Sequence, residues 1–403
     1  MPVRQLGGRR PRLSFLRSVC GAVALTLQAA SPALAADFYD INVILPLTGG
    51  ASFLGKAEQQ ALQIAEKVIN GAGGVQGRPV RFVIQDDQSS PQVAVQLATQ
   101  IVASHPTVVI GSAIVAMCNA MAPLMQQGPV MYCLSPGIHP KDGAYVFTSS
   151  VSTYDLARAV IRYYRLRGWT KIALLTSTDA TGQDAERGIH EILAEPENKA
   201  VTLVENQHFN PTDVSVSAQI ERIKGAEPQA LIAWTTGAPV GTVFKGIVQA
   251  GLDIPVATTN GNMTHVQMTQ YAGFLPKQLY IPSSEWPEHG PGQALDPAVE
   301  TAQRQFFGAF KAANILPDVG ATLAWDPAMI IVDGLRKMDK ATSAQLRDHI
   351  QRLKGYAGIN GVYDFMKIPQ RGLDEQDAVV TRWEASKMTW EVVSKPTGIP
   401  LAQ

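Results

Sequence analysis

The stretch Ile41–Ile69, INVILPLTGGASFLGKAEQQALQIAEKVI, decides the fold because a glycine-rich turn joins an apolar run to an amphipathic one. The apolar run predicts a buried strand, and residues 55–70 predict a helix. The same alternation continues along the chain to about residue 260. Because strands that alternate with helices pair in parallel, the sequence predicts a doubly wound α/β architecture.

The turn contains G-x-x-x-x-G-K, from Gly50 to Lys56, which raises the question of a phosphate loop. A phosphate loop needs Ser or Thr after the Lys, because that hydroxyl binds magnesium. The next residue is Ala57, which argues against a nucleotide site. The glycines instead leave backbone amides at a helix N-terminus, and ligands bind at the carboxyl ends of strands in open sheets. We therefore expect this turn to form one wall of a binding cleft.

Two α/β units follow one another, because the pattern restarts after TSSVSTYD, residues 148–155. Pro and Gly then interrupt it in LYIPSSEWPEHGPG, residues 279–292, and two further helices follow. We expect these two helices to cover the first unit. The predicted helices span 55–70, 91–104, 115–127, 154–167, 182–194, 213–225, 239–250, 295–313 and 322–338.

The first thirty-five residues have the features of a secretory signal peptide, residues 1–35. A basic start precedes the apolar VCGAVALTLQAA and an A-x-A site, Ala33–Ala35. The apolar part is too short for a comfortable transmembrane span. We expect cleavage before Ala36 and export to the periplasm; the pair Arg9-Arg10 leaves the choice between the Sec and twin-arginine routes open.

The charge balance and the motifs of the sequence argue against several classes of function. Lys and Arg together number 34, as do Asp and Glu, so the formal net charge is zero. This balance argues against a nucleic-acid partner, which favours a basic excess. Cys-His metal spacing and a Ser-His-Asp arrangement are both lacking in the mature sequence, so we expect no metal, no cofactor and no enzymatic activity.

Several motifs carry a resemblance to a known family: Pro46–Gly49, INGAGGVQGRPV (69–80), DDQSSP (86–91), VVIGS and CLSPG. Together they resemble the type I periplasmic solute-binding proteins of the branched-chain amino acid (Leu/Ile/Val-binding) ABC transporter family. The resemblance implies two Rossmann-like lobes joined by three hinge crossings. It also implies a small-molecule ligand between the lobes and delivery to an ABC permease in the inner membrane. We expect a monomer. The expected division is lobe 1 over 37–149 and 284–362, and lobe 2 over 150–283 and 363–403.

The resemblance also implies which residues surround the ligand, and three of them depart from the amino-acid pattern. Val115 and His139 stand where the family commonly has Ser and Thr, and Asn260 stands where it often has an acidic residue. An Asn cannot form the ion pair that a buried ammonium needs. We therefore expect an aromatic or aliphatic carboxylate without an α-ammonium, with His139 as a donor to it. The predicted ligand-binding residues are Phe53, Leu54, Ala113, Val115, Gly137, His139, Thr181, Thr235, Ala238 and Asn260.

Cys118 and Cys133 are the two cysteines that remain after the leader. The implied architecture brings them to neighbouring strand ends of one sheet, so a disulfide is a candidate, although two buried thiols explain the pair equally well.

Other functions remain open at this stage. A branched-chain or other amino acid is the alternative ligand, and a soluble sensor of the same fold is the alternative role. A secreted hydrolase is the least favoured interpretation.

Overall fold

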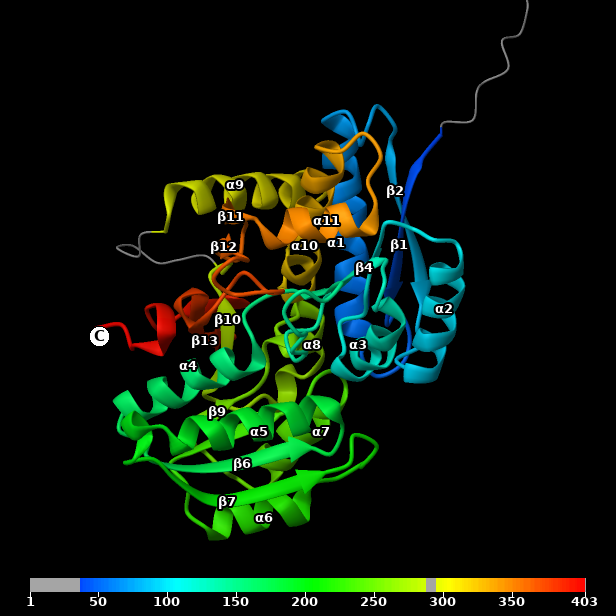
Figure 1. Cartoon of the computed structure of the whole chain (residues 1–403). Coiled ribbons are helices and arrows are strands. Elements are labelled where there is room, and N and C mark those ends of the chain that lie inside the picture. Colours follow the sequence, from blue (N-terminus) through cyan, green and yellow to red (C-terminus); the bar gives the residue numbers. More distant parts are fainter. Residues whose placement is uncertain (1–36, 288–294, 403) are drawn as a thin grey trace, which may run out of the picture. The chain divides into compact units, whose positions relative to one another are not determined.

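The computed structural model describes residues 37–287 and 295–402, so the predicted leader lies outside the described residues. Two sheets organise the described chain, with helices on both faces of each (Figure 1). All pairings in the first sheet are parallel, and its strand order is β2-β1-β3-β4-β5. Its strands are β1 Tyr39–Leu45, β2 Val80–Asp86, β3 Val108–Ile110, β4 Val130–Cys133 and β5 Val146–Thr148.

The second sheet has seven strands in the order β14-β13-β10-β9-β8-β6-β7. Five of them pair in parallel, whereas β13 runs antiparallel to β10 and β14 antiparallel to β13. Its strands are β6 Lys171–Ser177, β7 Thr202–Phe209, β8 Ala230–Trp234, β9 Val256–Ala257, β10 Leu279–Ser284, β13 Ala378–Glu384 and β14 Thr389–Val392. A separate hairpin pairs β11 Lys354–Ala357 with β12 Val362–Asp364.

The helices follow the amphipathic segments of the sequence. In the first lobe these are α1 Ser52–Gly71, α2 Pro91–Ala103, α3 Val115–Met121, α9 Pro297–Ala312, α10 Val319–Arg336 and α11 Ser343–Gln351. In the second lobe they are α4 Thr153–Leu166, α5 Ala180–Ala194, α6 Ser217–Gly225, α7 Pro239–Gln249 and α8 His265–Gln270. Six short 3₁₀ turns complete the described elements: 122–125, 196–198, 260–262, 272–274, 375–377 and 396–398.

The chain passes between the lobes three times, which gives the two-lobed α/β fold that the sequence predicts. The passages lie between β5 and α4, between β10 and α9, and between β12 and β13. Helix α10 packs along α1 of the first lobe (Figure 1), so the late helices do cover the first unit. The boundaries predicted at 149/150, 283/284 and 362/363 remain a prediction.

Two expectations about the elements are wrong. The helix predicted over 213–225 begins at Ser217, because residues 210–213 form a turn in which Asp213 and Asn210 side chains accept backbone hydrogen bonds. The stretch LYIPSS, expected to interrupt the pattern, is strand β10. Its Pro282 is tolerated because the pairing of β10 with β9 covers only Leu279 and Tyr280, so the missing N–H removes no bond to that strand.

Candidate functional site

The glycine-rich turn after β1 is held by the loop after β2. One carboxylate oxygen of Asp86 accepts from the backbone N–H of Leu47 at 2.9 Å, and the other accepts from the Thr48 hydroxyl at 2.6 Å. Gly55 lies so close to the strand end that a Cβ there would stand 2.3 Å from the carbonyl oxygen of Pro46. The turn therefore serves to pack α1 against β1 and to aim the start of α1 at the space between the lobes.

An enclosed cavity lies where the carboxyl ends of the strands of both lobes meet, as is usual for ligand sites in open α/β sheets. Its volume is about 20 Å³, close to the room that one water molecule needs. The lining residues are Leu54, Ala113, Ile114, Val115, Ser135, Pro136, Gly137, Thr153, Thr181, Trp234, Thr236, Thr259, Asn260, Gly261 and Leu323.

Six of the ten residues predicted from the sequence line this cavity: Leu54, Ala113, Val115, Gly137, Thr181 and Asn260. The other four lie close by but outside the lining. The Phe53 ring packs edge-on against Tyr271 at 6.3 Å. Thr235 is fully buried between two lining residues, and Ala238 is exposed.

The fourth, His139, forms a contact between the lobes at the rim. Its Nε2 lies 2.9 Å from Oδ1 of Asp184, and its ring stands 4.8 Å from that of Tyr154. The described structure therefore places the imidazole on a protein carboxylate and not in the cavity.

Nine lining residues are not among the ten predicted ligand-binding residues: Ile114, Ser135, Pro136, Thr153, Trp234, Thr236, Thr259, Gly261 and Leu323. Most are neighbours of predicted positions and follow the same strand-end rule. Leu323 is different, because it comes from α10, which is far along the chain and reaches the cavity only through its packing on α1.

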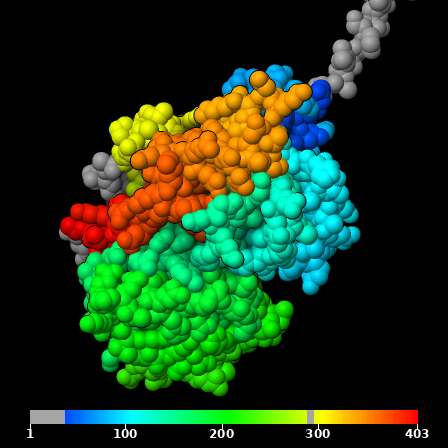
Figure 2. Space-filling model, viewed as in Figure 1, coloured from blue at the N-terminus to red at the C-terminus, as the bar shows by residue number. Residues whose placement is uncertain are grey.

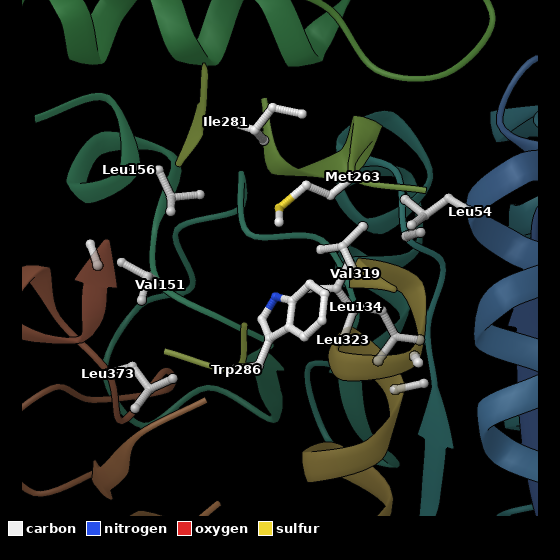
Figure 3. Packing of buried hydrophobic residues seen from close by; sticks show 14 of the residues in the cluster. Leu54, Leu134, Val151, Leu156, Met263, Ile281, Trp286, Val319, Leu323 and Leu373 are labelled. Carbon is white, nitrogen blue, oxygen red and sulfur yellow. The ribbon is translucent and has the colours of Figure 1, made fainter. Parts of the chain in front are cut away.

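The cavity is lined by both apolar and hydroxyl-bearing residues. Leu54 and Leu323 lie with Val319 and Met263 in the apolar cluster of Figure 3, in which Trp286 also packs. The hydroxyl groups come from Ser135, Thr153, Thr181, Thr236 and Thr259. No described lining residue carries a charge.

The lobes touch on either side of this cavity. The backbone N–H of Ala238 donates to the carbonyl of Gly50 at 2.9 Å, and that of Val319 donates to the carbonyl of Met263 at 3.2 Å. On the face in Figure 2, the cyan first-lobe residues and the green second-lobe residues meet along a seam. These contacts enclose the cavity between the lobes.

A buried arginine fixes one wall. The Arg371 guanidinium donates to the carbonyl oxygens of Pro136, Ile138 and Ser150 at 2.7–3.1 Å. Burial lowers its pKa to about 10, although nearby Asp155 and Asp184 favour the charged form. The residue therefore ties the loop that carries Gly137 to the first passage between the lobes.

Buried carboxyl groups lie beneath the cavity. The side chain of Glu58 is fully buried with no described hydrogen-bond partner, and burial raises its pKa well above the usual range, helped by Asp87 and Asp318. Asp318 caps α10 through Gly320 and accepts from the backbone of His265 in the other lobe, yet burial still raises its pKa to about 7.

Cys118 at the start of α3 and Cys133 at the end of β4 form a disulfide in the structure, with their Cα atoms 6.1 Å apart. The bridge joins the segments that carry Val115 and Ser135, so it braces the first-lobe wall of the cavity.

Among residues 37–287 and 295–402, no cluster of His, Cys, Asp and Glu is arranged to bind a metal. In the same part of the chain, every helix is too short or too polar to cross a membrane.

Comparison with known proteins shows which family has this fold. A sequence-family model described as periplasmic binding protein matches residues 39–387. The "Leu/Ile/Val-binding protein homolog 3" of Brucella melitensis is 27% identical over 256 residues, which cover 62% of this chain and 67% of the relative.

Two solved structures show the same fold with different ligands. The substrate-binding protein LivJ of Streptococcus pneumoniae, in complex with isoleucine, has a TM-score of 0.73 at 20% identity, covering 88% of this chain and 99% of that one. A solute-binding protein of an ABC transporter from R. palustris, in complex with benzoate, has a TM-score of 0.73 at 19% identity, covering 90% and 97%.

Proposed function

The chain belongs to the periplasmic binding protein family, and from that premise we propose that it captures a small organic acid between its lobes and delivers it to an ABC importer in the inner membrane. Its relatives are solute-binding proteins, not enzymes, and the family implies a periplasmic location. The finer part of the proposal is the ligand, an aromatic or aliphatic carboxylate without an α-ammonium.

The observation that carries the ligand class is the lining of the cavity. The hydroxyl groups of Thr153, Thr181 and Thr236 can donate to a carboxylate. The apolar lining residues would contact a ring or a short chain, which needs more room than the cavity has in this arrangement of the lobes. A carboxylate bound by several hydrogen bonds needs no cationic side chain, because those bonds favour the ionised form.

The lining also argues against a zwitterion. By the resemblance to the family, Asn260 stands where an acidic residue is often found, and no described lining residue bears a carboxylate. The nearest candidate behind the lining, Asp184, already pairs with Arg187 and His139. A buried ammonium without a carboxylate loses several kcal/mol of binding free energy, about a thousandfold or more in affinity.

A thermal-shift panel tests the proposal. The mature protein should be stabilised by aromatic and aliphatic acids and hardly at all by leucine, isoleucine or valine. A ligand at about a hundred times its Kd adds about 2.7 kcal/mol to the free energy of unfolding. Benzoate and butanoate, each compared with its neutral amide, show whether the carboxylate is needed.

Amino-acid binding is the second candidate, and the name of the Brucella melitensis relative favours it. A large shift with leucine together with submicromolar binding by calorimetry would overturn the acid proposal. The ammonium would then have a carboxylate partner in the cleft.

A further inference from the structure

In the carboxylate of Asp184, on α5, one oxygen has hydrogen-bond partners and the other has none among the described residues. Oδ1 lies 2.9 Å from Nε2 of His139 and accepts from Arg187 at 3.2 Å. Oδ2 is buried and has no hydrogen-bond partner among the described residues, and the side chain as a whole is 2% exposed. A buried oxygen without a donor costs free energy, so such groups are rare and call for a physical reason.

The unpartnered oxygen lies directly behind the cavity wall. A Cβ built on Gly137 would stand 3.2 Å from Oδ2 of Asp184, 3.0 Å from Oγ1 of Thr153 and 2.6 Å from a methyl of Val115. Gly137, Thr153 and Val115 all line the cavity. Because Gly137 has no side chain, nothing from that residue stands between Oδ2 and a ligand group that enters beside it.

The partners of Oδ1 decide what kind of group Oδ2 can bind. Arg187 already supplies a cation to Oδ1 at 3.2 Å, and His139 contacts the same oxygen from the other lobe at 2.9 Å. What the second oxygen lacks is a hydrogen-bond donor and not a second full cation. A hydroxyl group supplies that donor without the desolvation cost of an ammonium.

We infer that Asp184 determines specificity by accepting a hydrogen bond from a hydroxyl group of the ligand, so that the preferred ligand is a hydroxylated acid. This inference rests on the proposed function, because it concerns the second polar group of the same ligand. Repulsion between carboxylates keeps the ligand carboxylate away from Asp184. The acid group then lies against lining residues other than Gly137, Thr153 and Val115, the three that surround Oδ2 of Asp184.

Calorimetry with matched ligands tests this. Benzoate, the three hydroxybenzoates and the corresponding methoxybenzoates are titrated into the mature protein. The best hydroxybenzoate should bind about ten- to a hundredfold more tightly than benzoate, as expected for a hydrogen bond to a charged group. Its methoxy analogue has similar bulk but no donor, and should lose that gain.

Variants of α5 separate Asp184 from general effects. Asp184→Ala also removes the contact with His139, so it is judged by the ratio of hydroxybenzoate affinity to benzoate affinity. That ratio should fall to about one, and Asp184→Asn, a neutral acceptor, should restore part of it. Glu191→Gln removes an acidic group from the exposed side of the same helix and should leave all affinities unchanged. Circular dichroism and thermal unfolding establish that each variant is folded.

The outcomes distinguish the two proposals. If benzoate binds but hydroxy and methoxy analogues bind equally well, or if the preference survives in Asp184→Ala, the inference about Asp184 is wrong and the acid ligand stands. If no acid binds and leucine does, the proposed ligand class fails, and the inference fails with it.

Discussion

At the scale of single residues, Cys118 and Cys133 brace the first-lobe wall of the cavity. They are 15 residues apart in sequence, and closing a loop of about that size stabilises a protein by about 3 kcal/mol in the chain-entropy view. We predict that the exported protein contains this bridge and that reduction lowers its melting temperature. Mass spectrometry without reductant should show a loss of two hydrogen atoms; two freely alkylated thiols in native protein would refute it.

Single residues also mark the limit of prediction from sequence. Counting from strand ends pointed to Val115 and Asn260, and both line the cavity, because parallel strands end at one edge of the sheet and their next residues meet there. That they contact the ligand stays a prediction. The same counting put His139 on the ligand, although the structure pairs it with Asp184. Asp184 lies within α5, not at a strand end, so only the packing of the two lobes reveals it.

At the scale of elements, Asp318 is the N-cap of α10 and is 7% exposed. Burial raises its pKa from 3.8 to about 7, so the folded state binds its proton more tightly than the unfolded state does. The stability from this group is fully present below about pH 4 and is lost as the pH rises to about 7. The free energy of unfolding should therefore fall over that range.

Asp318→Asn removes this titration but keeps a good N-cap. We predict that the free energy of unfolding of the variant, minus that of the wild type, is larger at about pH 8 than at about pH 5. Urea denaturation of both proteins at both pH values measures this difference. Asp296→Asn is the matched control, because Asp296 caps α9 in the same way but is exposed. A variant whose stability relative to the wild type is the same at both pH values would show that Asp318 is not held protonated.

The elements differ in how far the sequence predicts them. The motif DDQSSP predicts a cap at Ser90 and a first turn at Pro91, and Ser90 does accept from Val93 at the start of α2. Strands β13 and β14 were not predicted, because β13 follows a largely irregular segment after β12 and the two strands pair antiparallel at the sheet edge. Their place depends on β10, which is distant in sequence, and local periodicity carries no information about such a pairing.

At the scale of the whole molecule, the lobes close through a contact that needs glycine. Gly237 has a φ of +86°, and a Cβ there would stand 2.4 Å from the carbonyl oxygen of Gly50 in the other lobe. Its own N–H donates to Asn262 and its carbonyl accepts from Gln267, so the loop cannot easily retreat. A side chain at this position should therefore oppose closure.

We predict that Gly237→Ala weakens ligand binding by roughly tenfold or more, because it disfavours the closed form. In the wild type, small-angle scattering should show a smaller radius of gyration with ligand than without, and the variant should show less of this change. Gly168→Ala is the control for backbone strain, since Gly168 has a φ of +82° and a Cβ there would meet no other atom within 4 Å. Equal effects of the two substitutions would assign the loss to strain alone.

The small cavity between the lobes has a kinetic consequence. Because it holds about one water molecule, a solute cannot enter while the lobes are in this arrangement, and every binding event must begin from molecules that have opened. At low solute concentration, the observed rate of association then rises in proportion to the concentration of the solute. At high concentration it levels off at the frequency of opening, which the hinge sets and the solute does not.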